Sequence, residues 1–166
     1  TLNPEDIVFM GLNEELENND TANKASSEWR FHRDIYLNKK GALAIVHAHS
    51  PHATAVSSHG KTIPPFHYMV AIAGGEDIKC AEYATFGTEE LSKNVIKALE
   101  NRSACLMSNH GQVAFGKNLE EAFELAQEIE NICQQYIIAL KIGQPKILSF
   151  EEMKKVLDKA KNYKKG

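Results

Sequence analysis

Residues 42–60 read ALAIVHAHSPHATAVSSHG, an apolar run that ends in two histidines and is followed at once by Ser-Pro. The run predicts a strand over residues 42–49, on which alternate side chains point to the same face. His47 and His49 therefore share a face and stand ~6.6 Å apart along the strand, close enough for both imidazoles to reach one ion. A His-x-His pair alone is a weak signal, because two exposed or packed histidines show the same pattern.

The Ser-Pro pair predicts a short helix over residues 52–58, since serine is a good N-cap and proline suits the first helical turn. Elsewhere strands and helices alternate, with neither an internal repeat nor a clear linker. The predicted strands cover residues 5–12, 68–75 (with a turn), 103–111 and 112–116, and the predicted helices cover residues 28–38, 89–100 and 119–140, with a last helix from about Ser149. The class is α/β or α+β.

Local signals sharpen three of these helices. Ser26 or Ser27 is predicted to cap the helix over 28–38, and Thr88 the helix over 89–100. The long helix carries an apolar stripe made of Leu119, Ala122, Phe123, Ala126, Ile129, Cys133, Tyr136, Ile137 and Leu140.

Composition predicts one globular domain over residues 1–166. A net charge of -3 gives no general attraction to nucleic acid or an anionic membrane, and no apolar run approaches the ~20 residues of a membrane span. Three cysteines without a CxxC pair are expected to be inert thiols in a reducing cytoplasm. We therefore expect neither nucleic acid nor a membrane among the partners.

Two further residues strengthen the case for a metal site. His110 ends an apolar strand directly before a glycine, where a backbone turn can present its ring, and Glu28 lies in the first turn of a predicted helix. Three histidines with one open position are typical of catalytic zinc, and a nearby carboxylate can act as a base. Spacing alone does not show that these segments meet.

Several longer motifs occur together and in order: SSEWRFHRDIY, VHAHSPHATAVS, IPPFHYMVAIAGG, AEYATFGTEEL and NHGQVAFGKNLEEAFELAQEIE. In combination they resemble the class II aldolase/adducin family, from about Leu2 to Tyr163. The resemblance implies a three-layer α/β/α sandwich with a mainly antiparallel central sheet, assembled as a homotetramer with sites at the subunit interfaces. Members of this family also carry a preceding helix and a Gly-Asn-Ser phosphate loop, so we expect that this chain lacks the N-terminal part of the domain.

The resemblance also assigns a metal centre. It implies one Zn²⁺ per subunit, held by His47, His49 and His110. Glu28 matches the catalytic carboxylate, which ligates the resting metal and moves away from it to act as the base.

The resemblance assigns the substrate site as well. Tyr68 matches a catalytic tyrosine that reaches the site of a neighbouring subunit. Ser26 and Ser27 match part of the phosphate site, and Phe86 and Tyr163 match residues that shape the aldehyde pocket.

The implied reaction is the reversible cleavage of a ketose 1-phosphate, L-fuculose 1-phosphate first among them, to dihydroxyacetone phosphate and an aldehyde, L-lactaldehyde in that case. No lysine Schiff base is needed, because a Lewis acid stabilises the charge. Three alternatives stay open: a pentulose-phosphate 4-epimerase, for which aspartate is expected in place of Glu28, a methylthioribulose-phosphate dehydratase, and a non-catalytic adducin-like interaction domain, which would lack the histidines.

Overall fold

The computed structural model describes residues 3–13 and 25–163. In this part of the chain, four strands form one sheet in the order β1-β4-β3-β2: β1 is Ala44–Ala48, β2 Cys80–Ala81, β3 Ala104–Met107 and β4 Gly111–Gly116. β4 is antiparallel to both β1 and β3, whereas β2 is parallel to β3. The sheet is therefore mixed: the expected antiparallel arrangement holds for β1 with β4 and for β3 with β4, but not for β2 with β3.

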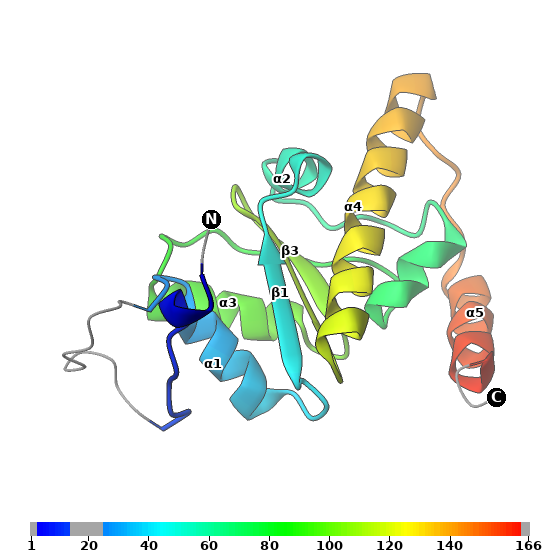
Figure 1. Ribbon diagram of the computed structural model, residues 1–166. Coiled ribbons are helices and arrows are strands. Elements are labelled where there is room, and N and C mark those ends of the chain that lie inside the picture. The colour runs from blue at the N-terminus through cyan, green and yellow to red at the C-terminus, as the bar shows by residue number, and fades with distance from the viewer. Residues whose placement is uncertain (1–2, 14–24, 164–166) are drawn as a thin grey trace.

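Helices cover both faces of this sheet (Figure 1). The α-helices are α1 (Trp29–Asn38), α2 (Pro51–Ser57), α3 (Glu89–Ala98), α4 (Leu119–Ile142) and α5 (Phe150–Tyr163), and the 3-10 helices are η1 (Pro4–Asp6) and η3 (Tyr68–Ala73). α1 and α3 pack together on one face, and α4 lies across β1 and β4 on the other, beside α2 and η3. No helix in the described residues is both long enough and apolar enough to cross a bilayer.

Alternation along the strands divides the core into two clusters. In β4, Val113 packs in the cluster that holds Phe31 and Ile35 of α1, whereas the next residue, Ala114, packs in the cluster that holds Ile129 of α4. Each fully buried Phe or Ile side chain contributes about 1.5–3 kcal/mol relative to an exposed one. The sheet is thus held from both sides, and its strand ends are rigid places for functional side chains.

Most of the predicted helices and strands are confirmed, and so are the Thr88 cap and the start of the last helix near Ser149. The Thr88 hydroxyl accepts the Leu91 N–H at 3.2 Å, at the start of α3. The Ser149 hydroxyl accepts the Glu152 N–H at 3.2 Å, at the start of α5. Local side-chain chemistry determines these helix starts, which is why the sequence predicts them well.

Two predicted strands are wrong. Residues 5–12 contain the end of η1 and then backbone without regular structure, because no strand among the described residues pairs with them. Residues 68–75 form η3 and its cap, where the His67 ring accepts the Met69 N–H and Gly74 takes the left-handed conformation at φ 102°. A short buried apolar run does not by itself distinguish a strand from a helix.

Two finer predictions are also wrong. The N-cap of α1 is Glu28 rather than Ser26 or Ser27, and it makes no side-chain capping bond. The stripe on α4 is only partly buried: Leu119 and Phe123 are more than half exposed, whereas the unpredicted Leu125 and Ile132 are in the core.

Candidate metal centre

The end of β1 brings two imidazoles together, as alternation along the strand predicts. The Nε2 atoms of His47 and His49 lie 3.1 Å apart. Two nitrogens bound tetrahedrally to one zinc ion at ~2.0–2.1 Å are ~3.3 Å apart, so the observed spacing fits shared coordination.

His110 completes the group from the turn between β3 and β4. Asn109 takes the left-handed conformation at φ 54°, and the His110 N–H donates to the Met107 carbonyl at 3.1 Å. The His110 ring centroid lies 4.9 Å from that of His47 and 4.7 Å from that of His49. One ligand atom from each imidazole lies within 4.8 Å of the others, and no other such group of His, Cys, Asp or Glu occurs in the described ranges.

Gly111 has a different role from the one that the sequence indicates. The left-handed turn conformation is that of Asn109, whereas Gly111 lies close to the backbone that ends β1. A Cβ built on Gly111 would overlap the main-chain oxygen of Ala48 and lie 3.2 Å from Cα of His49. The missing side chain therefore allows the two strand ends to converge.

Hydrogen bonding and burial prepare His47 as a ligand. Its Nδ1–H donates to the main-chain carbonyl of Gln112 at 2.8 Å, which leaves the lone pair of Nε2 free. Burial lowers the pKa of His47 to about 4; the Gln112 hydrogen bond acts to raise this pKa, and the neighbouring histidines act to lower it. Burial also lowers the pKa of His110. Both rings are neutral at neutral pH, the form that binds a metal ion.

Glu28, which the family resemblance assigns as the catalytic carboxylate, lies beside this group. Its Oε2 is 3.9 Å from His110 Nε2, and its side chain is 13% exposed. Among the described residues, this buried oxygen has no hydrogen-bond partner. Burial raises the pKa of Glu28, while the nearby His49 acts in the opposite direction. A buried carboxylate oxygen without a donor is the group that a cation would stabilise, so the four side chains fit a divalent metal.

The predicted phosphate residues lie at the start of α1 and are exposed. The Ser26 hydroxyl accepts the Glu28 N–H at 3.2 Å, and the Ser26 carbonyl accepts the Trp29 N–H at 3.1 Å. Two amides that the helix terminus could offer an anion are therefore already hydrogen-bonded. Gly87 packs against Ser27, since a Cβ built on it would lie 3.1 Å from the Ser27 carbonyl oxygen. This contact brings the turn at Phe86 beside the serines.

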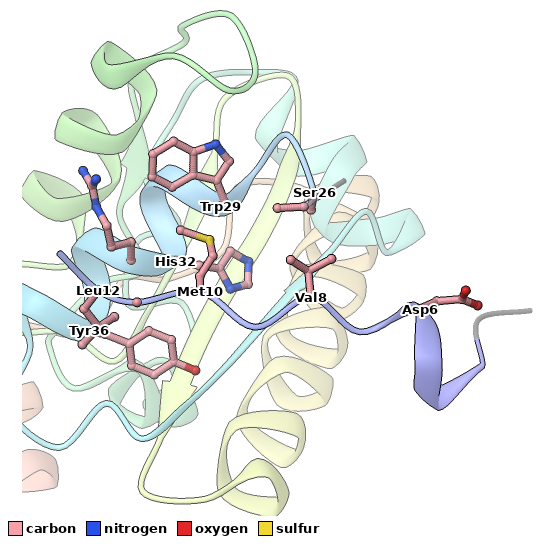
Figure 2. Close-up of a pocket in the computed structure, with 11 residues that line it drawn as sticks. Asp6, Val8, Met10, Leu12, Ser26, Trp29, His32 and Tyr36 are labelled. Carbon is pink, nitrogen blue, oxygen red and sulfur yellow. The ribbon is translucent and has the colours of Figure 1, made fainter. Parts of the chain in front are cut away.

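A pocket of about 570 Å³ lies between α1 and the N-terminal segment of the chain (Figure 2). The segment 6–12 crosses over α1 there, and its Val8 and Met10 face Trp29 and His32. Ser26 also lines the pocket. His32 lines this pocket, and its ring centroid lies 6.5 Å from that of His47. It is not one of the three histidines that could share a metal ion.

Of the two predicted tyrosines, the structure describes the side chain of Tyr68 only. Tyr68 begins η3, is 53% exposed and stacks on His67 at a centroid distance of 4.8 Å. The structure gives it no contact with the three histidines in the part of the chain that it describes. Tyr163 ends α5, and its side chain lies outside the described residues. The role of Tyr68 in the site of a neighbouring subunit and the role of Tyr163 in the aldehyde pocket both stay predictions.

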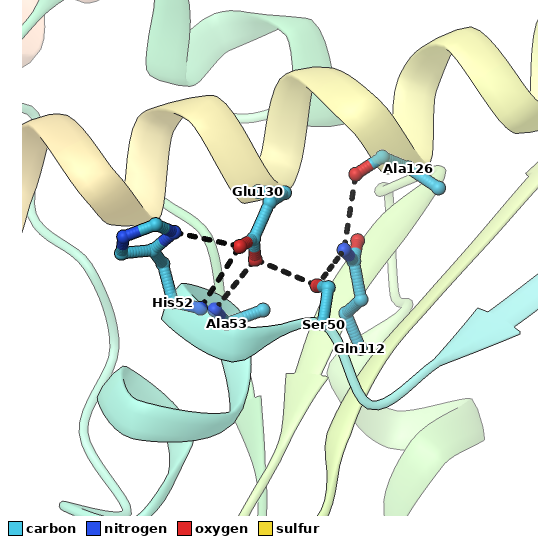
Figure 3. A network of polar contacts seen from close by, with 6 residues as sticks. All are labelled: Ser50, His52, Ala53, Gln112, Ala126 and Glu130. Carbon is cyan, nitrogen blue, oxygen red and sulfur yellow. Dashed lines mark hydrogen bonds and ion pairs between the residues drawn. The ribbon is translucent and has the colours of Figure 1, made fainter.

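Two residues near the site were not predicted, Gln112 and Glu130. Gln112 holds His47 through its carbonyl and is 1% exposed, and Glu130 binds the residues that follow His49 (Figure 3). Pro51 at the first position of α2 was a partial signal, because the amides after it need acceptors. The identity of the acceptor, on a helix far along the chain, has no local signal.

Comparisons with known proteins agree with this geometry. Residues 1–137 match the family model described as Class II Aldolase and Adducin N-terminal domain. A 5-methylthioribulose-1-phosphate/5-deoxyribulose-1-phosphate aldolase of Rhodospirillum rubrum is 47% identical over 162 residues, which cover 98% of this chain and 72% of that protein. An L-fuculose phosphate aldolase of Escherichia coli is 51% identical over 139 residues, which cover 83% of this chain and 65% of that protein.

A solved structure shows the same fold. An L-fuculose 1-phosphate aldolase superposes with a TM-score of 0.78 at 42% identity, over 82% of this chain and 64% of that chain. The chain therefore spans about two thirds of the length of these relatives. Because the family model matches most of the sequence, and the relatives agree in fold and identity, the chain belongs to the class II aldolase/adducin family.

Proposed function

We propose that the protein is a metal-dependent aldolase that cleaves a ketose 1-phosphate between C3 and C4 to dihydroxyacetone phosphate and an aldehyde. The observation that carries the proposal is the convergence of three imidazoles beside Glu28, whose buried Oε2 has no hydrogen-bond partner among the described residues. If this group of residues had only a structural role, a hydrogen-bond donor would be expected beside that oxygen, because a buried acceptor without a donor costs free energy of folding. The names of the relatives support the same reaction class.

His47, His49 and His110 would hold the cation, with Glu28 as a further ligand at rest. We propose Zn²⁺, because three imidazoles and an open position are its usual catalytic set. When bound, the cation supplies a Lewis acid that stabilises the negative charge developing on the oxygens of the ketose.

Glu28 would carry the proton of the reaction. As the C3–C4 bond breaks, the C4 hydroxyl gives its proton to solvent and the fragment becomes an aldehyde, while C3 gains a proton from the Glu28 carboxyl group, which a proton from solvent then restores. In the reverse direction Glu28 takes the proton from C3. Burial raises the pKa of Glu28, which favours its protonated form and so its use as an acid as well as a base.

The remaining substrate contacts follow from the family resemblance. We assign Ser26 and Ser27 to the phosphate, and Phe86 and Tyr163 to the aldehyde pocket. Tyr68 would donate to the aldehyde oxygen in the site of a neighbouring subunit of a homotetramer. Its exposed position away from the histidines of its own chain supports such a role.

Two sugars are candidates. L-fuculose 1-phosphate is favoured by the relative with 51% identity, and 5-deoxyribulose 1-phosphate by the relative that aligns with 98% of this chain. Both would release dihydroxyacetone phosphate and differ only in the small aldehyde. Glu28 disfavours the epimerase alternative, and the three histidines disfavour an adducin-like domain without catalysis.

The test is to incubate full-length protein with several ketose 1-phosphates and to measure dihydroxyacetone phosphate with a coupled reductase. We expect its release from at least one of the two sugars, its loss with a chelator and its return with Zn²⁺. Comparing kcat/KM between the sugars identifies the substrate. No dihydroxyacetone phosphate from metal-loaded protein with any sugar would contradict the proposal.

A further inference from the structure

The carboxylate of Glu130 on α4 caps the helix that begins after the metal-site strand (Figure 3). Pro51 at the first position of α2 has no N–H, so the first amides are those of His52 and Ala53. These amides donate to Glu130 Oε1 at 2.9 Å and Oε2 at 2.8 Å, and the His52 ring adds an Nδ1 contact at 2.7 Å. One carboxylate from a different helix thus replaces the usual side-chain cap of Ser50.

The charge of Glu130 suits this place. A helix N-terminus carries a partial positive charge, which stabilises a nearby carboxylate. Burial acts to raise the pKa of Glu130, but hydrogen bonds from Ser50, His52 and Ala53 outweigh it and hold the pKa below its usual value. Glu130 is therefore ionised at neutral pH and accepts all of these bonds.

The same carboxylate is connected to His47 of β1 and to His49, which directly follows that strand. Ser50, the residue after His49, donates its hydroxyl to Glu130 Oε2 at 2.6 Å and accepts the Gln112 side-chain N–H at 2.8 Å. That Gln112 amide also donates to the Ala126 carbonyl of α4 at 3.0 Å. Ser50 is thus held between α4 and β4.

Gln112 joins this network to the other imidazole. Its main-chain carbonyl accepts the His47 Nδ1–H at 2.8 Å, and its side chain holds Ser50 beside His49. A cap for α2 needs only the bonds to His52 and Ala53. The bonds among Glu130, Ser50 and Gln112 have a further result: they fix the backbone after His49 relative to the carbonyl that orients His47.

We propose that Glu130, Ser50 and Gln112 are positioning residues of the metal centre, which hold the His47 and His49 imidazoles at the spacing that one ion requires. The inference rests on the proposed metal-dependent function. None of the three is assigned to the metal or the substrate, and each acts through a histidine. Partners of this kind typically change metal affinity 10- to 100-fold.

The experiment measures Co²⁺ binding by full-length protein without sugar, both as affinity and as the visible absorption spectrum of the bound ion. Ser50→Ala removes the link but leaves the Glu130 bonds to His52 and Ala53. Glu130→Gln replaces one acceptor oxygen by an NH2 group, so the side chain cannot keep the full set of bonds to Ser50, His52 and Ala53. Ser50→Thr keeps the hydroxyl. Glu124→Gln is the matched control, an exposed carboxylate on the same helix.

We expect Ser50→Ala and Glu130→Gln to bind Co²⁺ about 10- to 100-fold more weakly with an altered spectrum, and Ser50→Thr and Glu124→Gln to resemble the wild type. If folded Ser50→Ala binds Co²⁺ with the same affinity and spectrum as the wild type, the network is only a helix cap. If the wild-type protein itself binds no Co²⁺, the inference is also overturned. Because no sugar is present, intact Co²⁺ binding without aldolase activity would contradict the proposed function alone.

Discussion

Replacing Gly111 by alanine should separate the strand ends that bring the histidines together. The new Cβ would overlap the Ala48 main-chain oxygen and lie 3.2 Å from both the Ala48 carbonyl carbon and the His49 Cα. Backbone atoms cannot turn away as a flexible side chain does. Restoring ordinary contact distances therefore requires a shift of up to ~1 Å between β1 and β4.

The shift has two measurable results. Overpacking of this kind costs about 1–3 kcal/mol of the free energy of unfolding. It also moves His49 away from His110, so metal affinity should fall on the order of 10- to 100-fold, or about 1.4–2.7 kcal/mol of binding free energy. Urea unfolding of metal-free protein measures the first effect, and Zn²⁺ competition against a chromophoric chelator measures the second.

Gly116 provides the matched control at the opposite end of β4. A Cβ built there would lie 2.7 Å from the Ala122 nitrogen and 2.8 Å from the Glu121 Cβ, so Gly116→Ala is also overpacked, but far from the histidines along the strand. We expect both variants to lose stability and only Gly111→Ala to lose affinity. Equal Zn²⁺ affinity in both variants would refute the link between close strand approach and the metal site.

Four further predictions concern the site and its support. His49→Ala should lose most of the bound metal in elemental analysis, and unchanged stoichiometry would contradict the ligand assignment. Glu28→Gln should keep the fold and the metal but lose turnover on the order of 10²- to 10⁴-fold, whereas wild-type turnover would leave Glu28 no role as a base. Mixing the inactive variants Tyr68→Phe and His49→Ala should partly restore activity once their subunits exchange. If mass spectrometry shows exchange but activity does not return, Tyr68 does not act in the site of a neighbouring subunit. Since the pKa of Glu130 is lowered on folding, its stabilising contribution is complete above the ordinary value of 4.5 and is lost as the pH falls through the folded value. Urea unfolding should therefore show a steeper acid loss in the wild type than in Glu130→Gln, and parallel curves would contradict this.

The sequence predicted the elements whose causes are local. Alternation over residues 42–49 predicted β1 and the shared face of His47 and His49, because side-chain direction in a strand depends only on its period of two. The Thr88 cap likewise depends on groups three residues apart. The family resemblance, which the comparisons confirm, added the fold and the grouping of distant motifs.

The tertiary structure alone decided the features that depend on partners far along the chain. Residues 5–12 have strand-like composition but no partner strand among the described residues, and a strand requires one. On α4, Phe123 is apolar yet 52% exposed, because packing against the sheet selects which side of the helix is buried. Likewise, the approach of Gly111 to Ala48 and the capping of α2 by Glu130 arise from the packing of elements distant in sequence. Local patterns thus pointed to the candidate ligand residues, whereas packing determined the distances between them, since contacts between separate segments leave no periodic signal in the sequence.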